Sequence, residues 1–156
     1  MSNQTDFLAK ALAHAELARH MFPEYAACEA ALESAWGKSR LAREANNLFG
    51  EHQHHVPIYE TYVLHPNDNV DPNDDWIKFP SWKECFESRM DTLHRLAAKV
   101  YSDGKPQYPH YVAALAAPDG ETFVKEVSQT WAQDPTRAEH VLQIHRAHFK
   151  ATGEIV

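Results

Sequence analysis

The spacing of apolar residues along the chain predicts a mostly helical protein. In several segments an apolar residue recurs every three or four positions, which is the period of an amphipathic helix. Start signals support this prediction, because Pro23 fits a first helical turn and Ser81 precedes Glu84 at capping-box spacing. Asp134 followed by Pro135 is a further start signal. The pattern predicts about six helices, at residues 6–18, 23–35, 39–45, 81–100, 119–133 and from 134 onward.

Residues 51–80 break the helical period and predict a small β-lobe. The stretch VPIYETYVLH is rich in β-branched and aromatic residues, as expected of a strand. PNDNVDPNDD carries the Pro, Asn and Asp typical of a turn, and WIKF can return as a second strand. The chain has 156 residues, no internal repeat and no low-complexity linker, so we expect one domain over residues 1–156 with this lobe inserted at about 51–80. The expected fold class is α+β, mostly α.

The charge balance and the hydropathy exclude two classes of partner. The chain has 15 Lys and Arg against 22 Asp and Glu, a net charge of −7, so it offers no basic stripe for nucleic acid. No run reaches the roughly 18 apolar residues that span a bilayer, so we expect no membrane insertion. The polar and charged residues 1–20 do not resemble a secretory signal, and we expect the chain to be made in the cytoplasm. Cys28 and Cys85 lie in amphipathic helical patterns and are expected as reduced, buried thiols rather than a disulfide.

Glu33 is the residue whose position suggests chemistry. It falls near the end of the apolar segment 23–35, four positions after Glu29, so the two carboxylates share a helix face. A solvated acidic face is the alternative. However, apolar surroundings, a neighbouring carboxylate and the negative end of the helix dipole all favour a protonated carboxyl over a carboxylate. A carboxyl group that stays protonated near neutral pH is what a general acid requires.

The stretch AALESAWGKSRLAREANNLFG, which contains Glu33, resembles the signature of the glucosaminidase family of peptidoglycan hydrolases, glycoside hydrolase family 73. FPSWKECFE and TWAQDPTRAEHVLQI resemble two later segments of that family, so the similarity spans about residues 23–144. The resemblance implies a lysozyme-like fold, with a helical lobe, a small β-hairpin lobe and a groove between them. It also implies hydrolysis of the β-1,4 bond after N-acetylglucosamine in peptidoglycan glycan strands, with Glu33 as the catalytic acid and no cofactor.

A glycosidase usually needs a second carboxylate, and the resemblance points to the β-lobe for it. Glu60, 27 positions after Glu33, is the candidate, since the family's proposed partner lies in a Thr-x-Glu-Tyr-type strand. In an inverting mechanism the two carboxyl groups should lie roughly 6.5–9.5 Å apart to admit water. Assistance by the substrate's own N-acetyl group is the alternative, and Glu60 would then be an exposed strand residue. Rival carboxylates in the neighbouring turn are Asp68, Asp71, Asp74 and Asp75.

One amide and several aromatic side chains are candidate substrate contacts. Aromatic rings stack on the apolar faces of sugars, and an amide can bond an acetamido group. The candidates are Asn47, Phe49, Tyr59, Tyr62 and Trp131. Asn47 can instead hold its turn, and Phe49 and Trp131 can instead pack in the core. Trp131 and Arg137 stand where the family usually has tyrosine, which keeps a non-catalytic glycan-binding domain open as an alternative.

A histidine cluster and the family's neighbours supply the remaining alternatives. The imidazoles of His52, His54, His55 and His65 can bind metal, but no HExxH, CxxC or comparable spacing accompanies them, so no metal is expected. A muramidase or lytic transglycosylase of similar fold would use one glutamate to cleave the other glycosidic bond. We expect a monomer that acts on the cell wall, in the periplasm or outside, after release by lysis or by a specialised secretion route. Phage lysin, bacterial autolysin and effector all stay open.

Overall fold

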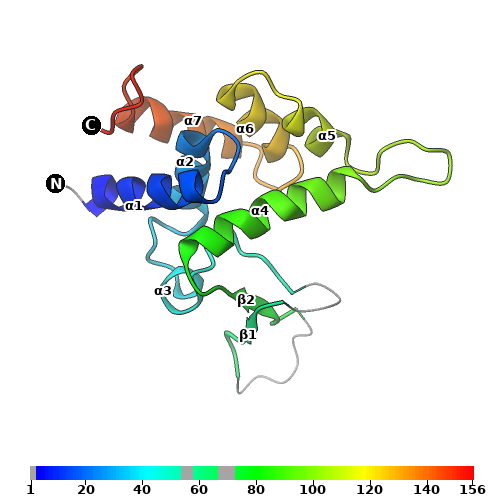
Figure 1. Cartoon of the computed structure of the whole chain (residues 1–156), viewed down its shortest axis with the longest axis horizontal. Helices are drawn as coiled ribbons and strands as arrows, with labels where there is room; N and C mark the ends of the chain where they lie inside the picture. The colour runs from blue at the N-terminus through cyan, green and yellow to red at the C-terminus, as the bar shows by residue number, and fades with distance from the viewer. Residues whose placement is uncertain (1–2, 54–57, 67–72) are drawn as a thin grey trace.

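The computed structural model describes residues 3–53, 58–66 and 73–156 (Figure 1). Its helices are α1 (Asn3–Leu17), α2 (Pro23–Glu33), α3 (Arg40–Ala45), α4 (Trp82–Ala97), α5 (Pro109–Leu115), α6 (Gly120–Ser128) and α7 (Arg137–His148). Its strands are β1 (Glu60–Tyr62) and β2 (Trp76–Lys78). Figure 1 shows α4, in green, crossing the middle of the molecule, with the strands on one side and α5, α6 and α7 on the other. A mostly helical chain with a small β-lobe confirms the predicted fold class.

Helix α2 lies inside the helical lobe and is closely packed by its neighbours. Its fully buried alanines are Ala26, Ala27, Ala30 and Ala31. Because these side chains are small, α1 and α7 can both pack against the helix. Helix α6 also approaches closely at its first residue, Gly120, where a Cβ atom would lie 2.1 Å from the ring of Tyr25. The glutamates of α2 are therefore carried on a tightly enclosed helix.

Helix α4 begins as the sequence predicts. The Ser81 hydroxyl accepts a hydrogen bond from the backbone N–H of Lys83 at 3.2 Å and donates one to the Glu84 carboxylate, which satisfies groups at the helix start. The buried stripe of α4 continues through Phe86. Arg89 lies on the same stripe and is fully buried, so the helix brings a charge into the helical lobe.

The β-lobe is a two-stranded antiparallel sheet tied to the turn after α3. Strand β1 pairs with β2 so that Glu60 lies opposite Lys78. The Asn47 side-chain amide donates to the carbonyl oxygens of Glu51 and Ile77, both at 2.9 Å. The Asn47 side-chain oxygen accepts from the Glu51 N–H at 3.0 Å. The predicted strands therefore form, although each has only three residues.

Two helix boundaries near the C-terminus differ from the prediction. Helix α6 ends at Ser128, earlier than predicted, and α7 begins at Arg137 rather than at Asp134. Asp134 instead accepts hydrogen bonds from the Thr136 N–H at 2.8 Å and hydroxyl at 2.6 Å. Such a local side-chain turn competes with helix formation. Trp131 therefore lies on the loop between α6 and α7. Helix α5 is a further helix, which the sequence pattern did not predict as a separate element.

Both cysteines are buried free thiols, as predicted. Burial raises the pKa of Cys28 and of Cys85, so neither thiol ionises near neutral pH. The Cys85 sulfur packs on the turn after α3, where the Leu48 N–H points to it at 3.4 Å. None of the described helices is long and apolar enough to cross a bilayer.

Candidate active site

Glu33 is the last residue of α2, close to the helix end that the sequence predicts. The helix stops there because the Ser34 hydroxyl donates to the Ala30 carbonyl at 2.6 Å and accepts from the Gly37 N–H at 2.9 Å. Trp36 and Gly37 then adopt left-handed backbone conformations, with φ of 58° and 79°. The Glu33 side chain is left 22% exposed, so a carboxylate stands at the edge of an otherwise buried helix.

A buried arginine from α7 holds the carboxylate of Glu33. Arg137 Nε donates to Glu33 Oε1 at 2.7 Å. The same guanidinium donates from Nη2 to Glu29 Oε2 and from Nη1 to Ser128 Oγ, both at 2.8 Å. The Arg137 side chain is 1% exposed, so it makes these contacts away from water, where charge-assisted hydrogen bonds are strong.

A second buried arginine completes what we call the ionic network, which consists of Glu29, Glu33, Arg89 and Arg137. Arg89 Nη1 and Nη2 donate to Glu29 Oε1 and Oε2 at 3.0 and 2.7 Å, a bidentate geometry. Burial alone would raise the pKa of Glu29, but the Arg89 and Arg137 guanidinium groups lower it to about 2. Burial alone would lower the pKa of Arg137, but Glu29 and Glu33 raise it. Both arginines of the network therefore bind glutamates of α2.

His20 borders the ionic network as a neutral imidazole. Its Nδ1 lies 2.7 Å from the Met21 carbonyl oxygen, which can only accept, so Nδ1 carries the proton. The other ring nitrogen, Nε2, then accepts from Arg89 Nη1 at 3.3 Å. Burial and the Arg89 charge lower the pKa of His20 to about 4. Protonating His20 would therefore place a second cation beside Arg89.

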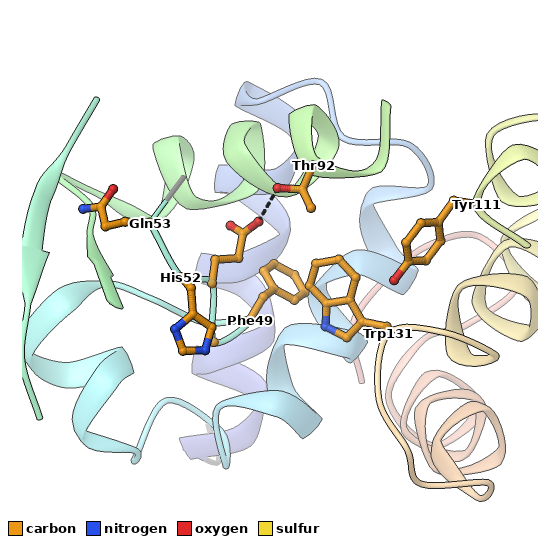
Figure 2. A pocket seen from close by; sticks show the side chains of 8 residues that line it. Phe49, His52, Gln53, Thr92, Tyr111 and Trp131 are labelled. Carbon is orange, nitrogen blue, oxygen red and sulfur yellow. Dashed lines mark hydrogen bonds between the residues drawn. The ribbon is translucent and has the colours of Figure 1, made fainter. Parts of the chain in front are cut away.

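An aromatic cavity of about 280 Å³, which we call the central cavity, lies close to this network. Its lining residues are Phe49, Gly50, Glu51, His52, Gln53, Thr92, Tyr111 and Trp131. Figure 2 shows Phe49 and Trp131 next to each other, with Thr92 reaching down from α4. The Arg89 guanidinium carbon lies 4.5 Å from the ring centroid of Trp131 and 4.7 Å from that of Phe49. The ionic network therefore lies against the aromatic wall, although Glu33 itself does not line the cavity.

Glu51 is a second buried carboxyl of the site, and sequence reasoning missed it. It is 5% exposed and lines the central cavity, and Thr92 Oγ1 donates to its Oε1 at 2.8 Å (dashed line in Figure 2). Burial raises the pKa of Glu51, and the hydroxyl groups of Thr92 and Ser88 offset only part of that effect. The signal in the sequence was a glutamate directly after the apolar turn that ends at Gly50. Arg89 was also missed, although it falls on the apolar stripe of its helix.

The two predicted substrate-binding residues in the turn after α3, Asn47 and Phe49, are largely buried. Asn47 is 1% exposed and its amide is bonded to backbone groups of the β-lobe, so the structure favours the turn-holding role over sugar binding. Phe49 is 4% exposed and packs edge-on against Phe86, with 5.5 Å between ring centroids. Part of Phe49 still lines the central cavity, together with the half-buried Trp131. These two predicted contacts lie together.

The three predicted residues of the β-lobe do not line the central cavity. Glu60 is 72% exposed and lies 3.9 Å from the Lys78 ammonium group. Tyr59 and Glu60 line a separate cavity of about 480 Å³. Tyr62 turns towards α3, where its hydroxyl donates to the Glu44 carboxylate. Tyr59 also lines a third cavity, which shares Gln53 and Thr92 with the central cavity, so the β-lobe residues adjoin the wall of Phe49 and Trp131 without being part of it.

The turn carboxylates and histidines that the structure describes have local partners. Asp74 accepts from the N–H groups of Leu64 and His65 at 2.7 and 2.8 Å, as a turn residue does. The Asp75 carboxylate lies 2.8 Å from His52 Nδ1. Outside the described residues lie Asp68, Asp71, His54 and His55. Within residues 3–53, 58–66 and 73–156, no three His, Cys, Asp or Glu side chains gather as a metal site requires.

Sequence comparisons identify a family and one curated relative. Residues 9–149 match the glucosaminidase family, described as mannosyl-glycoprotein endo-beta-N-acetylglucosaminidase. Exo-glucosaminidase LytG of Bacillus subtilis (strain 168) is 29% identical over 125 residues, which are 80% of this chain and 43% of that protein. This chain therefore spans less than half the length of that relative.

Solved structures show the same fold. The glycoside hydrolase domain of Salmonella typhimurium FlgJ superposes with a TM-score of 0.69 at 22% identity, covering 94% of this chain and 88% of that one. The catalytic domain of the Listeria monocytogenes autolysin Auto gives 0.62 at 21% identity, covering 94% and 85%. Both likenesses confirm the predicted lysozyme-like glycoside hydrolase fold. Since the family model covers most of its length, this chain belongs to the glucosaminidase family of glycoside hydrolases, as its ALESAWG and NNLFG motifs predict.

Proposed function

We propose that this chain hydrolyses the β-1,4 bond after N-acetylglucosamine in the glycan strands of peptidoglycan, with Glu33 as the general acid. The observation that carries the proposal is the setting of Glu33, which is 22% exposed and anchored by a buried arginine. A general acid must be reachable by the substrate and fixed in position. Glu33 meets both requirements, whereas Glu29 is fully enclosed. The names of two relatives, a glucosaminidase and an autolysin, support the sugar and the substrate.

The chemistry begins with proton transfer from Glu33 to the glycosidic oxygen as the bond from that oxygen to C1 breaks. We favour substrate assistance for the next step, in which the acetamido oxygen of the same sugar bonds to C1. Water then opens this intermediate and returns a proton to the Glu33 carboxylate. The aromatic wall formed by Phe49 and Trp131 offers a surface for the apolar face of a sugar.

The position of Glu60 is the reason to favour substrate assistance over a second carboxylate. Glu60 is 72% exposed, its partner Lys78 lies 3.9 Å away, and it lines a different cavity from Trp131. An exposed carboxylate with one loose partner loses side-chain freedom when it is fixed against a substrate. Glu60 remains the candidate base in an inverting mechanism if the β-lobe closes on the glycan.

The experiment that tests the proposed function is digestion of purified peptidoglycan followed by mass analysis of the reducing ends. We expect N-acetylglucosamine ends. Muramic acid ends would assign the chain to the muramidases, and anhydro-muramic ends to the lytic transglycosylases. Glycan binding without any product would support the non-catalytic alternative and contradict the proposal.

The lengths of the products test a second part of the proposal, which is cleavage within strands. Internal cleavage gives fragments of mixed length early in the digestion. Release of single sugars from strand ends would instead match the exo activity in the name of the curated relative. A peptidoglycan substrate places the action at the cell wall, and size-exclusion chromatography tests the expected monomer.

A further inference from the structure

The two carboxylate oxygens of Glu33 have different surroundings. Oε1 accepts from Arg137 Nε at 2.7 Å. No residue in the described part of the chain donates a hydrogen bond to Oε2. Because the side chain is 22% exposed and Oε1 is held by Arg137, we take Oε2 as the oxygen that a substrate would meet.

The position of Arg137 is fixed by contacts that do not involve Glu33. Its Nη1 donates to Ser128 Oγ on α6 and its Nη2 to Glu29 Oε2 on α2, both at 2.8 Å. Glu29 is in turn held by two hydrogen bonds from Arg89 of α4. A planar guanidinium with two of its nitrogens fixed in this way has a set orientation for its third. The Nε–H therefore points at one place whether or not Glu33 is protonated.

We propose that Arg137 is the positioning residue of the catalytic acid: it binds Oε1 of Glu33 and so leaves Oε2 as the oxygen that carries and delivers the proton. This inference rests on the proposed role of Glu33. A protonated carboxyl group keeps one carbonyl oxygen, which still accepts from an arginine N–H. The contact therefore survives both protonation states. Arg137 cannot replace Glu33 as the acid, because a guanidinium stays charged at any working pH.

The same contact predicts a pH effect on the rate. Arg137 from α7 binds both Glu33 and Glu29 of α2. Arg89 from α4 binds Glu29, and Tyr111 from α5 is electrostatically coupled to Arg89, Arg137 and Glu29. Burial raises the pKa of Tyr111 to about 12, so it is neutral, and Glu29 and Arg89 balance each other. Glu33 is one of the groups that raise the pKa of Arg137, so the two side chains are electrostatically coupled. Removing the Arg137 charge should therefore change the dependence of kcat on pH.

The test is steady-state hydrolysis of N-acetylated peptidoglycan by wild type, Arg137→Met and the control Arg146→Met across a range of pH. Arg146 lies on the same helix but pairs with Glu139 at the surface, with both side chains more than half exposed. Arg137→Met should lower kcat by about 10- to 100-fold through lost orientation, with KM nearly unchanged. The pH profile of its kcat, including the alkaline midpoint, should differ from that of wild type. Arg146→Met should match wild type in all three measurements.

Two further variants keep the inference testable if Arg137→Met does not fold. Arg137→Lys keeps the charge but has one nitrogen for three partners, so kcat should fall while the alkaline midpoint stays near that of wild type. Ser128→Ala removes one anchor and should cost less in kcat than Arg137→Lys. An unchanged kcat in Arg137→Lys, or a loss in Arg137→Met with an unmoved midpoint, would overturn the inference.

Glu33→Gln separates failure of this inference from failure of the proposed function. If Glu33→Gln keeps the activity of wild type, Glu33 is not the acid and the proposed function is wrong in that respect. If Glu33→Gln is inactive and the pH profile of Arg137→Met is unmoved, only the positioning role of Arg137 fails.

Discussion

The two carboxylates that the sequence singles out, Glu33 and Glu60, stand in opposite surroundings. Glu33 accepts a 2.7 Å hydrogen bond from an arginine that is 1% exposed. Glu60 is 72% exposed and faces Lys78 at 3.9 Å, itself 43% exposed. The helical lobe thus holds its carboxylate through Arg137, which Ser128 and Glu29 fix in turn, whereas the β-lobe presents its own on a three-residue strand.

This difference in burial predicts which of the two carboxylates has its geometry fixed before substrate binds. A side chain with buried partners keeps its geometry before substrate arrives, whereas an exposed one is ordered only on binding, at a cost in entropy. Preorganised geometry is what proton transfer needs. Substitutions in the ionic network should therefore have large effects on stability and on kcat, and substitutions of charged residues on the β-lobe surface should have small ones.

The largest effect on stability is expected from Glu29→Gln. This change leaves two buried guanidinium groups without the carboxylate that binds both, and breaking a buried ion pair in this way costs about 3–5 kcal/mol of unfolding free energy. Urea unfolding at pH 7 measures it. The control is Glu121→Gln, which breaks an exposed pair with Lys125 and should leave the unfolding free energy nearly unchanged. An equal loss of stability in both variants would contradict the expectation that the buried pair matters more than the exposed one.

Acid should destabilise the helical lobe in two steps. The pKa of His20 is about 4 when folded and near 6.5 when unfolded, so the unfolded state binds the proton first and stability falls as pH drops from 6.5 to 4, by on the order of 3 kcal/mol. The pKa of Glu29 is about 2 when folded, so a further loss follows as pH drops from about 4.5 to 2.

His20→Gln separates the first of these steps from the second. Glutamine does not titrate, and its amide can still donate to the Met21 carbonyl and accept from Arg89. The slope of unfolding free energy between pH 6.5 and 4 should therefore flatten in this variant, as measured by urea unfolding at several pH values. A slope equal to that of wild type would show that another group is responsible.

A smaller effect is expected at the joint between the lobes, from Asn47→Ala. The change leaves the N–H and carbonyl of Glu51 and the carbonyl of Ile77 without their side-chain partner, at a cost of about 2 kcal/mol. Thermal unfolding measures it. Asn46→Gly is the comparison variant, since the Asn46 amide donates to the Phe79 carbonyl at 3.0 Å and to the Pro80 carbonyl at 3.4 Å, and its φ of 51° is one that glycine adopts freely. It should lose less stability than Asn47→Ala. An equal loss would mean that Asn47 is no more important to the joint than Asn46.

The smallest effect is expected from Lys78→Gln on the β-lobe. Its pair with Glu60 is loose and exposed, so the unfolding free energy should change by less than about 0.5 kcal/mol. The kcat of peptidoglycan hydrolysis should stay close to wild type. A clear fall in kcat would show that the β-lobe pair acts in the reaction and would weaken the contrast with Glu33.

Local patterns predicted most of the helices and the place of Glu33, because both depend on residues close in sequence. The Ser81 cap and the end of α2 formed as expected. Asp134 was wrong as a helix cap, since its carboxylate closes a turn with Thr136 instead. Phe49 and Trp131 were expected as groove residues and do share a cavity.

The ionic network could not be predicted from local patterns, because its partners are far apart in the chain. Arg137 lies 104 positions from Glu33, and Arg89 lies 60 positions from Glu29. A buried charge is stable only beside its partner, and no local periodicity reveals which distant residue that partner is. For the same reason, the sequence predicted that Glu33 would lie among apolar residues and near Glu29. It did not predict the arginine that the structure places against Glu33.

The most direct test of the contrast between the two carboxylates is to compare kcat for Glu33→Gln and Glu60→Gln on the same peptidoglycan. Glu33→Gln should lower kcat by about 10²- to 10⁴-fold, the usual contribution of a general acid, while Glu60→Gln should keep most of the wild-type rate. An equal loss in both variants would contradict the assignment of catalysis to the helical lobe alone and would make Glu60 the second catalytic carboxylate.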